Sequence, residues 1–210
     1  LDQFLNDSQL MPIVQSIRGC PFKCGFCVSG RQSSKFRNFS FERMKAEIDY
    51  IRCHSTSKSL RFADDNFGIL SSDLEVAKYL RYSHDIYKYP AVLKLLTSKV
   101  TNDRTRQIAK LLEPLCLMYL SFQTLTPSVL KNIRRSEISD SEIRKNLDFA
   151  RRNGIATGSA LIFCLPGESL KSFKETLDKT FEYRFDSIAL GVLWLLKGSE
   201  VATDKMREQY

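Results

Sequence analysis

Three cysteines stand within eight residues near the start of the chain and carry its clearest chemical signal. Cys20, Cys24 and Cys27 are four and three positions apart, on a loop that contains Pro21 and Gly25. Three thiolates at this spacing can converge on one cuboidal 4Fe-4S cluster. No fourth cysteine is near, so one iron would stay open for a substrate or cofactor, as in a catalytic rather than a structural zinc site. The loop therefore predicts a cluster that takes part in chemistry.

Zinc is the main competing metal, and it would need a further ligand. The two histidines, His54 and His84, fall in helical patterns and lack finger-like spacing to the cysteines. Cys53, Cys116 and Cys164 stand singly, and we expect the last two to be small core residues. This asymmetry favours metal ligation in a reducing compartment, the cytoplasm, over a disulfide framework.

Composition bounds the class of protein. The 210 residues are 43% hydrophobic and 27% charged, which is ordinary for a soluble globular domain. The longest apolar runs are roughly half of a membrane span, and no signal peptide opens the chain, so we expect no membrane partner. A net charge of +8 leaves RNA or another anionic partner open, but the scattered basic residues favour a solvated surface. The basic stretch of Arg31, Lys35 and Arg37 is interpreted as a surface loop, with contact to an anionic substrate or a neighbouring domain as the alternative.

Short β-rich runs alternate with segments of helical periodicity. Strands are expected at 13–17, 59–63, 92–97, 117–122, 157–163 and 187–193, and helices at 41–53, 73–82, 103–112, 141–153 and 170–184. Ser40 and either Ser139 or Asp140 suit helix N-caps, and Asn153-Gly154 suits a helix stop. Repeated β-α units require parallel strands with right-handed crossovers. The pattern predicts an α/β fold, either a partial barrel or a doubly wound sheet, with chemistry at the carboxyl ends of the strands.

Several segments, in order along the chain, resemble one enzyme family. The segment 19–27 resembles the CxxxCxxC signature of the radical S-adenosylmethionine (SAM) superfamily, with Phe26 as the usual aromatic before the last cysteine. Segments 63–67, 121–135, 161–168 and 193–200 resemble later motifs of its cobalamin-binding and methylthiotransferase branches. Cys164 stands where glycine is commoner, and Lys197 replaces the usual proline. The resemblance implies a partial (β/α)6 TIM-like barrel of parallel strands, the radical SAM core.

The resemblance also implies the cofactors. Cys20, Cys24 and Cys27 would hold a 4Fe-4S cluster, whose open iron would bind the amine and carboxylate of SAM. Electron transfer from the reduced cluster would then cleave a carbon–sulfur bond and give a 5′-deoxyadenosyl radical. An electron donor of the flavodoxin or ferredoxin type is the implied partner.

Positions within these motifs suggest the SAM contacts. We expect Phe26, Leu165 and Pro166 at the adenine, Asp64, Asp65 and Asn66 at the methionine amine, Ser121 and Gln123 at the ribose, and Arg135 at the carboxylate. Ser121 and Gln123, two apart on an expected strand, would point to the same face. The Asp64–Asn66 segment also fits an Asx turn that caps the next helix. Arg134 is the alternative to Arg135, either of which also fits a surface role, and Glu168 also fits a first-turn acid of the following helix.

The functional hypotheses differ in what lies outside these residues. We expect residues 1–210 to be the core of a longer protein, whose N-terminal cobalamin-type domain and C-terminal domain are absent from this sequence. A cobalamin-assisted enzyme that modifies an unidentified substrate, by methylation for example, is favoured. A methylthiotransferase acting on tRNA or a ribosomal protein is the first alternative. A non-catalytic iron–sulfur electron carrier is the second, but it would not need the SAM contacts.

Overall fold

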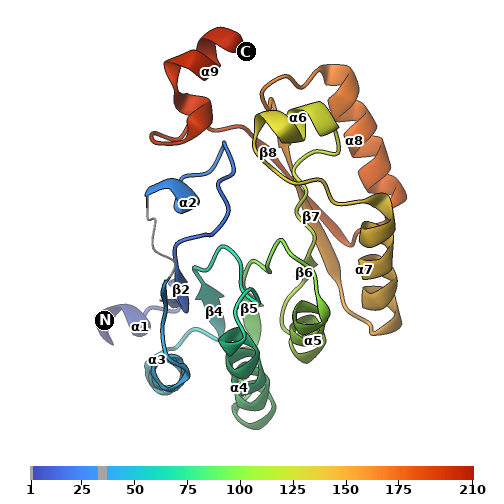
Figure 1. Ribbon diagram of the computed structural model, residues 1–210. Helices are drawn as coiled ribbons and strands as arrows, with labels where there is room; N and C mark the ends of the chain where they lie inside the picture. Colours follow the sequence, from blue (N-terminus) through green and yellow to red (C-terminus); the bar gives the residue numbers. More distant parts are fainter. Residues whose placement is uncertain (1, 33–36) are drawn as a thin grey trace. The chain divides into compact units, whose positions relative to one another are not determined.

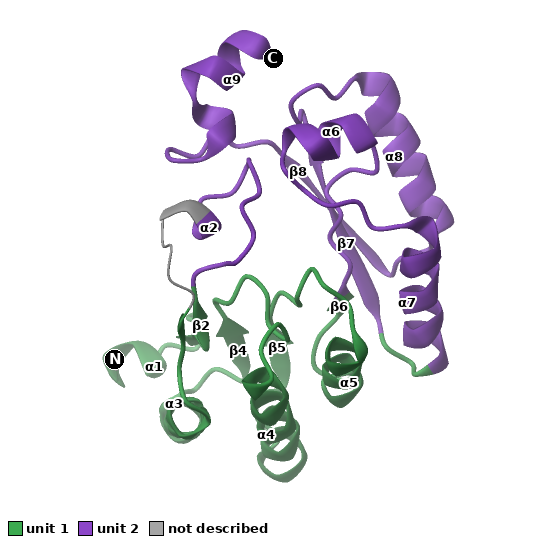
Figure 2. Ribbon diagram, in the orientation of Figure 1, with its two compact units in different colours: residues 1–18, 37–118, 153–155 green, residues 19–36, 119–152, 156–210 purple. Residues whose placement is uncertain are grey.

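A computed structural model of the protein describes residues 2–32 and 37–210. The chain forms two compact units (Figure 2). Unit 1 comprises residues 1–18, 37–118 and 153–155, and unit 2 comprises residues 19–36, 119–152 and 156–210. Of the basic stretch that follows the cysteine loop, Lys35 lies outside the described residues, as does the side chain of Arg31. Arg37 is exposed on a short strand.

Unit 1 is an α/β unit with a parallel three-stranded sheet in the order β1-β4-β5. Leu60 lies opposite Leu93 in this sheet, and Ile13 lies opposite Arg61. Helix α4 packs against both α3 and α5 (Figure 1). Its elements in chain order are α1 (Asp2–Leu5), β1 (Ile13–Val14), β2 (Ile17–Arg18), β3 (Arg37–Asn38), α3 (Phe41–His54), β4 (Ser59–Phe62), α4 (Ser72–Tyr87), β5 (Val92–Lys94) and α5 (Asp103–Leu111).

The core of unit 1 forms where the apolar faces of these helices meet the sheet. It includes Ile48 of α3, Leu60 of β4 and Leu80 of α4, each completely buried. Burial of an aliphatic side chain of this size contributes roughly 1.5–3 kcal/mol. The short β2 and β3 pair antiparallel with each other, so the strand expected at 13–17 is divided into β1 and β2.

Unit 2 is built on a second sheet, in the order β6-β7-β8. Strands β7 and β8 are parallel, with Leu161 opposite Leu190, and α7 and α8 lie along one side of β7 (Figure 1). The ring of buried Phe122 contacts those of Tyr183 and Phe185. Its elements are α2 (Ser29–Gln32), β6 (Met118–Tyr119, of which Met118 is counted in unit 1), α6 (Pro127–Asn132), α7 (Asp140–Arg152), β7 (Thr157–Phe163), α8 (Leu170–Glu182), β8 (Ser187–Val192), the 3-10 helix η1 (Glu200–Ala202) and α9 (Asp204–Gln209).

The predicted helix ends are confirmed. The Ser40 hydroxyl accepts a hydrogen bond from the Arg43 backbone N–H at 3.3 Å, and the Ser139 hydroxyl accepts one from Glu142 at 3.2 Å. Gly154 has a φ of +69°, a left-handed conformation that suits glycine after a helix. Among the residues that the structure describes, no helix combines the length and apolar content needed to cross a membrane.

Two predictions in unit 2 are wrong. The strand expected at 117–122 is regular only over Met118–Tyr119. Beyond it the chain reaches Gln123, which makes an isolated bridge with Leu161 and has a φ of +69°. A left-handed residue ends the strict alternation of a strand, so Ser121 and Gln123 do not share a face by strand geometry. Helix α6 was not predicted, because its six residues are too few to show a helical period.

Candidate iron–sulfur site

The cysteine loop belongs to unit 2 and carries three free thiols. Cys20 is 9% exposed and Cys24 is 3% exposed, while Cys27 is partly exposed. The Cys27 backbone N–H donates to the Cys24 carbonyl at 3.1 Å, so the last two cysteines lie on one turn. Across residues 2–32 and 37–210, no three His, Cys, Asp or Glu side chains are gathered closely enough to form a metal site. Convergence of the three thiols on one cluster therefore stays a prediction.

Backbone hydrogen bonds clamp the middle of the cysteine loop. The Gly25 N–H donates to the carbonyl of Ile133 at 2.7 Å, just after α6. The Gly25 carbonyl accepts from the N–H groups of Glu200 at 2.9 Å and Val201 at 3.2 Å, in η1. Farther along, a Cβ atom at Gly30 would overlap the carbonyl oxygen of Phe22, so only glycine allows the chain to fold back on itself there.

The last turn of α6 is a Schellman motif. Arg134 is left-handed, with a φ of +52°, and its N–H donates to the carbonyl of Lys131 at 3.1 Å. The N–H of Arg135 donates to the carbonyl of Leu130 at 2.9 Å. These two bonds are the pair that defines the motif, and they fix the direction in which the chain leaves the helix.

Arg135 is thereby brought against the cysteine loop. Its Nη1 donates to the sulfur of Cys24 at 3.9 Å, and its Nη2 donates to the backbone carbonyl of Ser121. Burial lowers the pKa of the guanidinium, and the nearby sulfurs of all three cysteines oppose that effect. Arg134, the alternative in the sequence, instead forms an ion pair with Glu200 at 2.8 Å and is exposed. The structure thus joins Cys24, Ser121 and Arg135 in one set of contacts.

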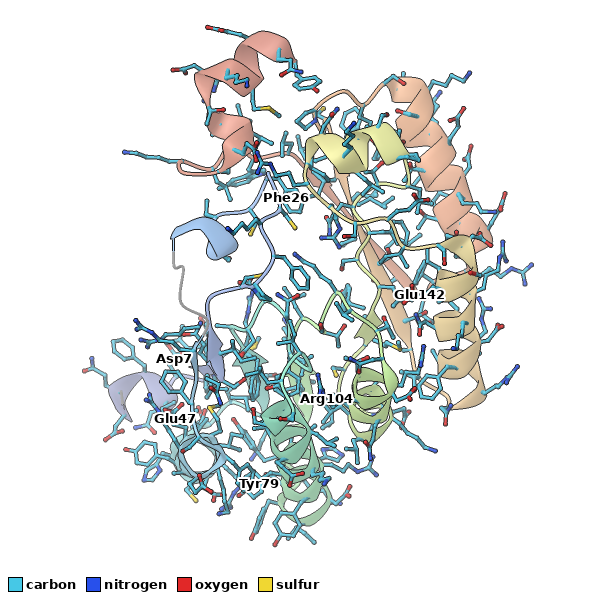
Figure 3. The ribbon with its side chains drawn as sticks, in the orientation of Figure 1. Asp7, Phe26, Glu47, Tyr79, Arg104 and Glu142 are labelled. Atoms are coloured by element: carbon cyan, nitrogen blue, oxygen red, sulfur yellow. The ribbon has the colours of Figure 1, made fainter. Side chains whose placement is uncertain are left out.

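The residues predicted at the adenine also come together within unit 2. Phe26, labelled in Figure 3 on the loop after β2, packs in an apolar cluster that includes Leu165. Leu165 is 2% exposed, and Pro166 is buried with its carbonyl accepting from Asn132 Nδ2 at 2.9 Å. Gln123 is 9% exposed after the end of β6. Asn132 was not singled out from the sequence, where nothing distinguishes it from other polar residues of α6.

Glu168 does not lie in the first turn of a helix, which corrects that interpretation. Helix α8 begins at Leu170 and is capped by Ser169, whose hydroxyl accepts from the N–H of Ser172. The buried Thr124 hydroxyl donates to Glu168 Oε1 at 2.7 Å, and burial raises the pKa of Glu168. The sequence did not single out Thr124, because a threonine is common in any strand or loop.

Asp64, Asp65 and Asn66 belong to unit 1. Asp64 is 1% exposed and accepts from both the backbone N–H of Ser16, at 3.0 Å, and its hydroxyl, at 2.7 Å. Asn66 Oδ1 accepts from the Lys99 N–H at 3.4 Å, and Asp65 is exposed. None of these contacts caps α4, which begins at Ser72, and the Asx-turn alternative stays a hypothesis. Contact with the methionine amine stays a prediction.

Of the two isolated cysteines expected in the core, one is partly buried and the other is exposed. Cys116 packs against the core of unit 1, donates to the Leu112 carbonyl at 3.8 Å, and has its pKa raised to about 12 by burial, as expected of a core residue. Cys164 is exposed with a φ of +65°, so the prediction that it is a core residue is wrong. Strand β7 ends at Phe163, and Cys164 is the left-handed residue that follows it.

Comparison with known proteins decides the family. Residues 14–180 match the model of the Radical SAM superfamily. The chain belongs to this superfamily. The predicted family is therefore confirmed, and the radical SAM family implies the predicted cofactor pair of a 4Fe-4S cluster and SAM.

Curated relatives of this radical SAM chain include two methyltransferases. The chain is 31% identical over 198 residues to the cobalamin-dependent radical SAM methyltransferase TokK of Streptomyces tokunonensis, covering 92% of this chain and 29% of TokK. It is 32% identical over 180 residues to the 2-(S-pantetheinyl)-carbapenam-3-carboxylate methyltransferase of Streptantibioticus cattleyicolor, covering 84% and 26%. The ribosomal protein uS12 methylthiotransferase RimO of Clostridium novyi is 22% identical, with 99% and 48% covered. The chain thus spans less than a third of the length of the two methyltransferases.

Solved structures support the fold. The radical SAM methyltransferase TsrM of Kitasatospora setae superposes with a TM-score of 0.74 at 15% identity, covering 90% of this chain and 35% of TsrM. Coproporphyrinogen III oxidase (HemN) of Escherichia coli superposes with a TM-score of 0.69 at 18% identity, covering 100% and 50%. The α/β fold with parallel strands is that of the radical SAM core, a partial TIM-like barrel, as predicted.

Proposed function

We propose that this chain is the catalytic core of a radical SAM enzyme that holds a 4Fe-4S cluster on Cys20, Cys24 and Cys27. The enzyme binds SAM beside the cluster and transfers a methyl group to an unidentified substrate, with cobalamin bound by another part of the full-length protein. The observation that carries the proposal is the family match over residues 14–180, which includes a loop with three free thiols. Methyl transfer and cobalamin are supported by the two relatives above 30% identity.

The donor set fits the cluster. Thiolates are the ligands of 4Fe-4S clusters, and two of the three cysteines are buried in a loop whose middle is held by three backbone hydrogen bonds. When bound and reduced, the cluster supplies the electron that cleaves a carbon–sulfur bond of SAM. The chain itself must hold the thiols in place and exclude water around them.

Other residues of unit 2 are proposed to hold SAM. Phe26 and Leu165 form part of an apolar cluster and offer the adenine a water-excluding surface, with Pro166 beside them. Gln123, nearly buried, is proposed to bind the ribose hydroxyls through its amide. The carbonyl of Ser121 is already engaged by Arg135, so its hydroxyl is the group left for the ribose.

Anaerobic reconstitution with iron and sulfide tests this function. We expect about four iron atoms per chain and an electron paramagnetic resonance (EPR) spectrum of the reduced cluster that changes when SAM is added. Cys24→Ala should lose most of the bound iron, while Cys53→Ala, a matched change at an exposed cysteine of α3, should keep it. A spectrum indifferent to SAM would refute the enzyme, and equal iron in Cys24→Ala and the unmodified chain would refute the ligand set.

We also propose an electron donor and a cellular location for this core. An electron donor of the flavodoxin or ferredoxin type and a cytoplasmic location agree with six cysteines that form no disulfide. The sequence of the full-length protein would distinguish a methylthiotransferase from a cobalamin-dependent enzyme. A methylthiotransferase carries three further cysteines ahead of this core, whereas a cobalamin-dependent enzyme carries a cobalamin-binding domain there.

A further inference from the structure

Both the backbone and the guanidinium of Arg135 are held in place. The Schellman turn fixes its backbone, and its guanidinium donates to the carbonyl of Ser121 and to the sulfur of Cys24. A guanidinium has five N–H groups in a fixed planar fork, so donation to one group restricts where the others point. The Schellman turn and the bond to Ser121 therefore together direct the guanidinium toward the sulfur of Cys24.

A cation in this position acts on the sulfur. Hydrogen bonds to ligand sulfurs and the net charge around a cluster set its reduction potential, because reduction adds a negative charge. A guanidinium that donates to a ligand thiolate stabilises the reduced state more than the oxidised state. All three cysteine sulfurs lie close enough to interact electrostatically with Arg135.

We propose that Arg135 is a positioning residue that donates to Cys24 and raises the reduction potential of the cluster, rather than a clamp for the carboxylate of SAM. The inference rests on the proposed function in one respect, that the cysteine loop binds the cluster. It differs from the expectation for Arg135 stated from the sequence.

The test is a redox titration of the reconstituted protein, without SAM, followed by the EPR signal of the reduced cluster. Arg135→Gln removes the charge and should make reduction at least tenfold less favourable, which for a one-electron couple is a midpoint potential about 59 mV more negative. Arg135→Lys keeps the charge but cannot span both contacts, so it should shift the potential less, in the same direction. Arg134→Gln is the matched control, because it removes a neighbouring charge that is exposed and paired with Glu200. Its midpoint should stay close to that of the unmodified protein.

A second measurement separates the competing role. Titrating each variant with SAM and following the EPR change gives the dissociation constant for SAM. An Arg135→Gln variant with an unchanged midpoint would overturn the proposal, whether its SAM binding is weakened, as for a carboxylate clamp, or unaffected. If Arg135→Gln assembles no cluster, Arg135→Lys decides: a shifted midpoint supports the proposal and an unchanged one overturns it. Failure of the unmodified protein to assemble a cluster would instead count against the proposed function.

Discussion

Asp73 is a buried carboxyl whose ionisation should destabilise the fold. It stands in the first turn of α4, is 1% exposed, and its Oδ2 accepts the backbone N–H groups of Gly68 at 2.8 Å and Leu70 at 3.0 Å. Burial raises its pKa from 3.8 to about 6, and these two hydrogen bonds only partly offset that effect. The perturbation that isolates the charge is Asp73→Asn, because the amide oxygen can accept the same two bonds.

The magnitude follows from the two pKa values. Between pH 3.8 and about 6 the folded protein keeps a proton on Asp73 that the unfolded chain has lost. The free energy of unfolding therefore falls as pH rises through this window, and the loss is complete above it. Each pH unit corresponds to about 1.4 kcal/mol, so the ionised carboxyl at pH 7 costs about 3 kcal/mol relative to the neutral form. Asparagine resembles the neutral form at every pH.

We expect the difference in unfolding free energy between Asp73→Asn and the unmodified protein to grow by about 2.4 kcal/mol from pH 4 to pH 7, because about 0.5 kcal/mol of the effect is already present at pH 4. Urea unfolding of the cluster-free protein, followed by far-ultraviolet circular dichroism, measures it at each pH. Any cost of burying the new amide N–H groups is constant with pH and does not affect the growth. Glu75→Gln is the control, an exposed acid on the same helix, and it should change the free energy by less than about 0.5 kcal/mol at any pH.

A difference that stays flat between pH 4 and pH 7 would refute this reasoning. It would mean that the hydrogen bonds from Gly68 and Leu70 fully offset the burial of the charge. A difference that shrinks with rising pH would carry the opposite sign and show that the ionised carboxylate stabilises α4.

Two glycines give further predictions. Gly30→Ala should sharply reduce the iron bound on reconstitution, because the new Cβ would overlap the carbonyl oxygen of Phe22 and force the cysteine loop open; iron analysis measures it. Gly158→Ala should destabilise unit 2 by about 1–3 kcal/mol, because its Cβ would lie 2.9 Å from the ring of Tyr119; urea unfolding measures it.

Matched glycines serve as controls for these two changes. A Cβ at Gly25 would lie 3.4 Å from Ile133, an ordinary contact, so Gly25→Ala should retain iron. A Cβ at Gly191, on the neighbouring strand, would come no closer than 3.8 Å to Leu161, so Gly191→Ala should barely change stability. Equal effects in a glycine and its control would show that the close approaches do not matter.

The elements predicted best are those whose signal is local and repeated. Long helices such as α3 and α7 were predicted within one or two residues, because their periodic apolar positions and their capping serines lie in the sequence itself. Short elements were not. Strand β6 is regular over only two residues, too few to show a period. Gln123, farther along, is left-handed, and no propensity marks a glutamine for that conformation.

For the site, the sequence predicted the residue types but not their partners. The spacing of the cysteines is a local property and was legible at once. The contact between Arg135 and Cys24 joins residues 111 positions apart, and the sequence alone suggested a carboxylate as the partner. The sequence likewise suggested a ligand contact or a helix cap for Asp64, whereas its carboxylate accepts hydrogen bonds from Ser16, between β1 and β2. When a side chain can bind several kinds of partner, its actual partner depends on which segments of the chain fold beside it.

Helix α6 explains why the missed contacts cluster in one place. Six residues are too few for a stable isolated helix, so α6 depends on the buried side chains of Val129, Leu130 and Ile133. Its C-terminal turn then provides the Ile133 carbonyl that holds the cysteine loop and the direction that brings Arg135 to Cys24. The packing that stabilises this short helix and the geometry of the cysteine loop therefore rest on the same apolar residues. No sequence motif predicts that the cysteine loop depends on α6, because the contacts involve backbone N–H and carbonyl groups, which are not specific to any residue type.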